Sequence, residues 1–153
     1  MTEATSSTEM GTILVGLDDS PAGRRALEWA AARAKESDAD LVVVHVLTYS
    51  RELANDVSIP GLTTWRRRLV ADVARPWTEP ARSIGVKVRT AVVEDDTAAA
   101  GLLGAAEREH ADLIVIGAHG QGSVFGRLLG ATAYRISHRA RVPVVIVPVA
   151  GER

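Results

Sequence analysis

The chain has 153 residues, about the length of one domain. Apolar residues make up 46% of it and charged residues 24%, which is typical of globular proteins and excludes a largely disordered chain, a collagen-like fibre and a coiled coil. Eighteen Lys and Arg against nineteen Asp and Glu leave a formal charge of −1, so no global positive field favours nucleic acid or an anionic membrane as a partner.

The first ten residues are rich in Thr, Ser and Glu, with no basic start and no apolar run, so they do not resemble a signal peptide. We interpret residues 1–10 as a disordered tail and residues 11–150 as one domain. The longest apolar runs fall far short of the roughly 20 residues that cross a bilayer. Cysteine is absent, which excludes disulfides and thiolate metal sites and is consistent with the expected cytoplasmic location.

Short runs rich in β-branched residues predict buried strands at residues 12–17, 41–47 and 112–117 and from Val142 to Val149. Residues 86–93 alternate between apolar and polar side chains, which predicts an edge strand with one face in water. Segments of helical length separate these strands. The pattern predicts a single doubly wound, Rossmann-like α/β domain whose five parallel strands follow the order 3-2-1-4-5.

The first helix should begin at Ser20 and Pro21, because serine is a good N-cap and proline fits the first helical position. Its apolar stripe consists of Ala26, Leu27, Ala30, Ala31 and Ala34. We expect further helices near residues 62–84, with a kink or break at Arg75 and Pro76, near 97–109 and near 130–139. Residues 47–61 show no clear period and are interpreted as a long, mobile loop.

Residues 117–132 follow a buried strand, contain five glycines and lead into a helix. Glycines let backbone amides approach a ligand closely, and a helix N-terminus offers unpaired N–H groups with a partial positive charge. Together they are typical of a phosphate site. Spacing alone leaves an alternative open, a flexible loop with glycines at its turns.

The first strand ends at Gly16, Leu17 and Asp18. In a doubly wound sheet, ligands bind beyond the carboxyl ends of the strands where the strand order reverses. The predicted order places that crevice between this strand and the one ending at Gly117. Asp18 either accepts hydrogen bonds from a ribose or base there or caps the first helix, and for Asp19 we favour capping.

Other residues that suggest chemistry have simpler interpretations. The four histidines lack zinc-type spacing, and we interpret His45 as a core or strand-end residue. No P-loop lysine motif and no Gly-x-Ser-x-Gly elbow occurs. The arginines at 66–68 are interpreted as a solvated face, and Trp65 and Trp77 are expected to pack their helix on the sheet.

Beyond these patterns, the chain resembles the universal stress protein family from residue 12 to residue 148. The resemblance is carried by TILVGLDDSPAGRRALEWA, by LVVVHVL and above all by ADLIVIGAHGQGSVFGRLLGATAYRISHRARVPVVIVP. The nucleotide-binding branch of that family has Gly-x2-Gly-x9-Gly followed by Ser or Thr, and Gly117, Gly120 and Gly130 match its spacing.

The resemblance implies an adenine-nucleotide site in which Asp18 and the backbone of Val46 contact the adenosine part. The amides of residues 117–120 and 130–132 would hold the phosphates of ATP or another adenine nucleotide, with or without Mg²⁺, and His119 and Arg127 are the nearby cations. The complete predicted site is Gly16, Leu17, Asp18, Val46, Gly117, His119, Gly120, Arg127, Gly130, Ala131 and Thr132.

The chain departs from the family pattern in three places. Ala131 replaces the phosphate-facing Ser or Thr, which removes a hydroxyl worth about 1 kcal/mol as a hydrogen bond, although Thr132 is adjacent. Asp19 stands where the family usually has glycine. The acidic run from Glu94 to Asp96 replaces the common Gly-x-Pro and would oppose a polyphosphate, unless Mg²⁺ turns that charge to advantage.

Two functions from different classes follow. The first is a stress-response module that binds an adenine nucleotide and regulates without catalysis; the second is a homodimeric adaptor whose pocket is vestigial. Slow ATP hydrolysis ranks third because no general base or catalytic lysine is evident. The strand from Val142 to Val149 should form an apolar sheet edge that pairs with a second copy, as the resemblance also implies.

Overall fold

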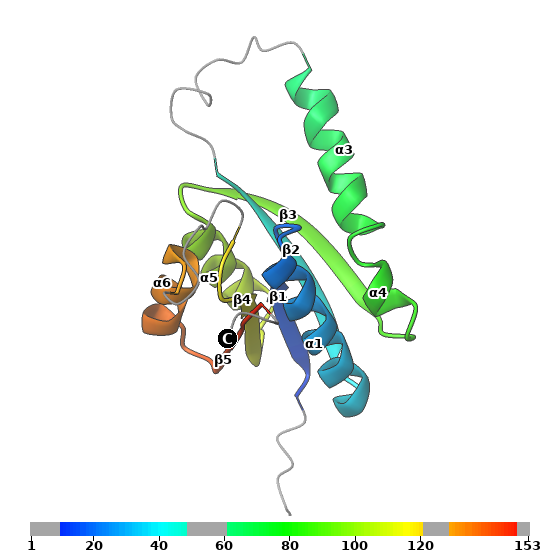
Figure 1. The fold of residues 1–153 in the computed structure, drawn as a ribbon, viewed down its shortest axis with the longest axis vertical. Helices are drawn as coiled ribbons and strands as arrows, with labels where there is room; N and C mark the ends of the chain where they lie inside the picture. Colours follow the sequence, from blue (N-terminus) through cyan, green and yellow to red (C-terminus); the bar gives the residue numbers. More distant parts are fainter. Residues whose placement is uncertain (1–9, 49–60, 121–128, 150–153) are drawn as a thin grey trace, which may run out of the picture.

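The computed structural model describes residues 10–48, 61–120 and 129–149. Five parallel strands form one sheet in the order β3-β2-β1-β4-β5 (Figure 1). The strands are β1 (Thr12–Gly16), β2 (Asp40–Thr48), β3 (Val88–Asp95), β4 (Leu113–Gly117) and β5 (Val144–Val147). The predicted fold class and strand order are confirmed.

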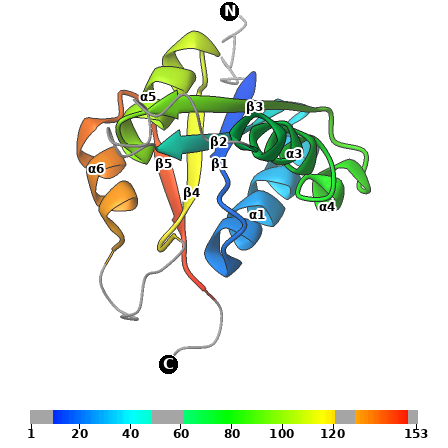
Figure 2. The ribbon, with the colours of Figure 1, turned by 90° about the horizontal axis from the view of Figure 1, so that it is seen from above.

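The three central strands are buried on both faces, which explains their continuous apolar sequences. Alternate side chains of β2 show this directly. Leu41 and Val43 pack towards α1 (Pro21–Ser37), whereas Val42 and Val44 pack towards α5 (Ala98–Arg108). Figure 2 shows α1 and α5 on opposite sides of the sheet. A ligand can therefore reach the central strands only at their ends.

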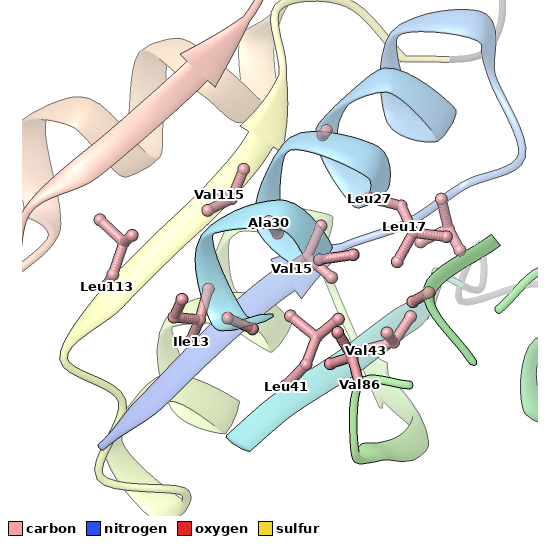
Figure 3. Packing of buried hydrophobic residues seen from close by; sticks show 14 of the residues in the cluster. Ile13, Val15, Leu17, Leu27, Ala30, Leu41, Val43, Val86, Leu113 and Val115 are labelled. Carbon is pink, nitrogen blue, oxygen red and sulfur yellow. The ribbon is translucent and has the colours of Figure 1, made fainter. Parts of the chain in front are cut away.

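The first core layer lies between the sheet and α1, joined by α4 (Glu79–Arg82). Figure 3 shows Leu27 and Ala30 of α1 lying over Ile13, Val15 and Val43. The predicted alanine and leucine stripe of α1 is entirely buried. Ser20 caps this helix by accepting a hydrogen bond from the Gly23 amide, as predicted. The start of α1 is thus fixed beside the end of β1.

The second core layer lies between the sheet and the pair α5 and α6 (Ala131–Arg139). Thr97 caps α5 through a hydrogen bond from the Ala100 amide. Leu102 and Ala105 of α5 and Ile136 of α6 are buried in this layer. Both helices run close to their predicted bounds, so the N-terminus of α6 lies directly after the glycine-rich segment.

The helix expected near residues 62–84 is interrupted. It is replaced by α3 (Leu62–Ala74) and the short α4, because the chain leaves the helical path at Arg75 and Pro76, as predicted. The buried Thr78 holds this corner by donating to the Ala74 carbonyl. The expectation for Trp65 is wrong, since Trp65 is 49% exposed. Helix α3 lies along the edge strand β3, and Val73 is its only buried residue. Trp77 is half-buried against the α1-side core, as expected.

Strands β3 and β5 form the two edges of the sheet, in agreement with the prediction for residues 86–93. Strand β5 is shorter than predicted because Pro143 and Pro148 flank it. The expected loop at 47–61 lies mostly outside the described residues, as does the expected tail, except that Met10 packs against the core. In the described part of the chain no helix has the length and apolarity needed to span a bilayer.

Candidate functional site

A cavity of about 380 Å³ opens at the carboxyl ends of β1, β2 and β4, where the strand order reverses. Its size lies within the usual range for small-molecule sites, and its position is the expected one for a doubly wound sheet. Every predicted site residue that the structure describes lines it: Gly16, Leu17, Asp18, Val46, Gly117, His119, Gly120, Gly130, Ala131 and Thr132. Arg127 lies outside the described residues.

Asp18 stands at the point where β1 leaves the sheet. The Leu17 amide donates to the Val44 carbonyl at 2.9 Å, which keeps β1 paired with β2 up to this residue. Asp18 Oδ1 then accepts hydrogen bonds from the Ser20 amide at 3.1 Å and from Ser20 Oγ at 2.5 Å. The buried Ser20 therefore both caps α1 and orients the Asp18 carboxylate.

The interpretation of Asp19 as a helix cap is wrong. The cap is Ser20, and the Asp19 carboxylate instead accepts from Arg24, with Oδ1 2.8 Å from Nη2 and 2.9 Å from Nε. Asp19 adopts a left-handed backbone conformation (φ 60°), which a short polar residue tolerates better than most others do. Its side chain turns away to α1 and does not line the cavity.

The opposite wall is made of backbone that approaches the β1 end closely. A Cβ on Gly120 would lie 2.8 Å from Asp18 Oδ2, and one on Gly117 would lie 2.8 Å from the carbonyl carbon of Ala22. Neither position has room for a side chain without movement of its neighbour. Glycine at these two positions is thus a packing requirement, and it brings the amides of the β4 end next to Asp18.

The N-terminus of α6 supplies hydrogen-bond donors to the same cavity. Gly130 is its N-cap, and the Gly130 amide is satisfied by the Ala118 carbonyl at 2.8 Å. The next three amides, of residues 131–133, have no intrahelical acceptor by geometry, and no side chain of the described residues caps them. All three residues line the cavity. Unpaired amides and the positive end of the helix dipole make this end suited to an anion.

The acidic run at the end of β3 lies outside the cavity wall. Glu94, Asp95 and Asp96 do not line the cavity, although Ala98 of the next helix does. Glu94 forms an ion pair with Arg66 of α3, and Asp95 Oδ1 accepts from the Asp96 amide at 2.7 Å. Among the described residues no group of three or more His, Asp or Glu side chains could hold a metal ion.

The cavity also has walls that the sequence analysis missed, chiefly the apolar Val44, Leu102 and Ile116. Val44 and Ile116 fall in strands predicted to be buried, and Leu102 falls in a predicted helix. All three are core residues that also border the cavity at the strand ends. The alternation along β2 could have revealed this, since Val44 and Val46 lie on the same face. His45, which was interpreted as a core or strand-end residue, also lines the cavity.

The fold and the cavity at the reversal of strand order define a doubly wound α/β protein with a candidate ligand site. The model of the universal stress protein family matches residues 10–148, and the chain belongs to this family. Among curated relatives, a universal stress protein of Mycolicibacterium smegmatis is 34% identical over 88% of this chain and 45% of its own length. Universal stress protein Rv1636 of Mycobacterium tuberculosis is 31% identical over 89% of this chain and 94% of its own length.

The chain thus spans about half the length of several curated relatives and nearly the full length of Rv1636. Solved structures share the fold. A universal stress protein in complex with cAMP has a TM-score of 0.69 at 22% identity, covering 93% of this chain and 99% of that chain. One from Archaeoglobus fulgidus in complex with dAMP has a TM-score of 0.64 at 16% identity, covering 90% and 97%.

Proposed function

We propose that the protein binds an adenine nucleotide, ATP, in the cavity at the strand ends and acts as a stress-response regulator without catalysing a reaction. The observation that carries this proposal is the meeting of two unlike groups in one cavity. A positioned carboxylate, Asp18, stands at one end, and the uncapped N-terminus of α6 stands at the other. A nucleotide has the matching polarity, with hydrogen-bond donors on its nucleoside and anionic phosphates.

The phosphates fit the α6 end. Amides of residues 131–133 donate to phosphate oxygens without any rearrangement, and the Thr132 hydroxyl lies beside them. A Cβ on Gly130 would lie 3.3 Å from the Ala118 oxygen, so the glycine leaves space at this wall that a side chain would fill. Backbone amides supply the hydrogen-bond donors here, so this part of the described wall can hold a phosphate without a lysine.

The nucleoside fits the other end. Ser20 donates to Asp18 Oδ1 and so fixes the carboxylate plane, with Oδ2 facing Gly120. A carboxylate accepts hydrogen bonds from ribose hydroxyls or from an exocyclic amine. The apolar surfaces of Val46 and Leu102 suit a purine ring. The complexes of two fold relatives with cAMP and with dAMP support an adenine nucleotide as the ligand class.

Binding can be tested without prior assumptions about the ligand. Purified protein is denatured, and the released small molecules are identified by mass spectrometry. We expect an adenine nucleotide, and we expect titration calorimetry with ATP to give saturable heat at one site per chain. Absence of both signals, in the unaltered chain and in Ala131→Ser, would favour the vestigial-pocket adaptor.

We further propose that two copies pair through β5. Its outer edge has no partner strand among the described residues. The Pro143 carbonyl accepts from Ile114 of β4 and the Val147 carbonyl from Ala118 just after it, so the peptide groups of Val144 and Ile146 point to the open edge. An antiparallel pairing about a two-fold axis would satisfy these groups.

The edge pairing predicts light scattering at twice the 16.3 kDa chain mass. Ile146→Lys should give a single chain mass, because a charge would enter the centre of the contact. Because Ile146 also packs against the core, the urea unfolding of this variant is measured as well, and only a monomer that remains folded supports the pairing. An unaltered protein that is monomeric at high micromolar concentration contradicts the pairing.

A further inference from the structure

A second hollow, which we call the Trp77 groove, lies on the α1 side of the β1 end. Its volume is about 470 Å³. One wall is the first half of α1, and the other is the corner between α3 and α4, where Pro76, Trp77 and Pro80 form an apolar surface. Trp77 is half-buried, so its indole is partly accessible. The groove takes no part in the nucleotide site proposed above, apart from one shared residue.

The charge of this groove is negative. Its cation, Arg24, is already paired with Asp19 at 2.8 Å. Two exposed carboxylates face the groove from opposite walls, Glu28 on α1 and Asp72 on α3. Neither forms an ion pair or a side-chain hydrogen bond within the described parts of the chain. The groove therefore offers two uncompensated negative charges beside an aromatic ring.

This combination selects a positively charged occupant. Indole rings attract guanidinium and ammonium groups, and proline and tryptophan surfaces pack against the aliphatic stems of Arg and Lys. Aromatic grooves with prolines also suit extended, proline-containing peptides. Anionic ligands are disfavoured by Glu28 and Asp72, so the Trp77 groove is unsuited to a second nucleotide.

Three contacts join the Trp77 groove to the nucleotide cavity. Leu17 lines both. The Leu17 carbonyl is 2.6 Å from His45 Nδ1, and because a carbonyl only accepts, Nδ1 carries the proton and donates. The His45 ring in turn meets the indole of Trp77 edge-on, with centroids 5.3 Å apart and planes at 82°. A movement of the β1 end on nucleotide binding would therefore shift the His45 ring against the Trp77 indole.

We infer that the Trp77 groove docks a basic, proline-containing segment of a partner protein, and that its occupation is linked to that of the nucleotide cavity through Leu17 and His45. The docking stands on the groove alone, whereas the linkage rests on the proposed function. Because linkage is reciprocal, the nucleotide must change the affinity for the segment by the same factor as the segment changes the affinity for the nucleotide.

The docking is tested with the blocked peptide acetyl-Pro-Arg-Pro-Arg-Pro-amide and the ¹⁵N-labelled full chain. The three tryptophans give three indole N–H signals, and Trp77→Phe assigns the relevant one. We expect the peptide to shift the Trp77 signal and to leave those of Trp29 and Trp65 in place. Glu28→Gln with Asp72→Asn should weaken binding about tenfold. Glu36→Gln with Glu107→Gln changes the net charge equally on exposed helix positions outside the groove and should leave binding unchanged.

The linkage is tested by repeating the peptide titration with saturating ATP, after subtraction of a blank titration of peptide into ATP. We expect the peptide affinity to change about fivefold or more. Equal binding by the two double variants, or a Trp77 signal that does not move, overturns the docking. Equal peptide affinity with and without ATP, in protein that binds ATP, overturns the linkage. A chain that binds the peptide but no nucleotide overturns the proposed function and the linkage, while the docking stands.

Discussion

The two ends of the nucleotide cavity are built by different means. The β1 end is organised by side chains: Ser20 connects Asp18 to the first turn of α1 through its hydroxyl. The α6 end is organised by backbone: glycines at 117, 120 and 130 bring main-chain groups together, and within the described part of the chain no side chain caps the helix. The β1 end depends on the hydrogen bonds of particular side chains, whereas the α6 end depends on glycines that leave room for the backbone to approach.

This difference determines how each end responds to mutation. Where a side chain makes the contact, its removal loses a hydrogen bond and leaves a neighbouring polar group unsatisfied. Where glycine makes room, the smallest addition displaces backbone, and the cost depends on whether the displaced atom can move. Substitutions at the two ends should therefore differ in what they damage, the fold or the ligand affinity.

The largest effect on the fold is expected from Gly117→Ala. Its Cβ would lie 2.8 Å from both the carbonyl carbon and the Cβ of Ala22, which belong to the rigid, buried start of α1. We expect a loss of about 1–3 kcal/mol in the free energy of unfolding, measured with urea. The matched control is Gly104→Ala in α5, where the nearest atom is the end of the flexible Arg108 side chain, at 3.3 Å. That change should stabilise by about 0.5–1 kcal/mol, and equal effects of both would contradict the packing argument.

The largest effect on binding is expected from Gly130→Val. The backbone of Gly130 has φ −61°, which valine tolerates, so the helix still begins there. The added Cβ meets the Ala118 oxygen at 3.3 Å, and the two methyl groups extend into the space assigned to phosphates. Calorimetry with ATP should show no binding, while the thermal midpoint falls only slightly. Retained ATP affinity would place the phosphates elsewhere.

The fold could be predicted because its signals are local. Continuous apolar strands, the Ser20–Pro21 start and the break at Arg75 all follow from residue chemistry within a few positions. The predicted site residues met in one cavity because strand order alone fixes which strand ends are neighbours. Trp65 was misplaced because amphipathicity does not tell how much of a helix its sheet can cover, and α3 lies on an edge strand. The Asp19–Arg24 pair was missed because it depends on a left-handed residue that no spacing pattern signals.

A smaller effect is expected at the β1 end from Ser20→Ala. The substitution removes the acceptor of the buried Gly23 amide and a donor to Asp18, which should cost about 1 kcal/mol or somewhat more in stability. The matched control is Thr97→Ala, which removes the corresponding cap of α5 at a residue that does not itself line the cavity. Both variants should lose similar stability in urea, but only Ser20→Ala should also weaken ATP binding, because Asp18 is no longer held. Equal ATP affinities in the two variants would mean that Ser20 acts only as a cap.

The smallest effect is a gain at the backbone-built end. Ala131 is the first residue of α6 and lines the cavity, so Ala131→Ser places a hydroxyl beside the unpaired amides without adding bulk elsewhere. One further hydrogen bond to a phosphate oxygen contributes about 1 kcal/mol, or roughly fivefold in affinity. The gain should appear with ATP and vanish with adenosine, because adenosine has no phosphate for the hydroxyl to reach.

Thr132→Val should weaken ATP binding if the Thr132 hydroxyl already serves this purpose, and combining it with Ala131→Ser should restore much of the lost affinity. A gain with adenosine as large as that with ATP would mean that the hydroxyl acts on the helix itself, and the assignment of the phosphates to the α6 N-terminus would be wrong.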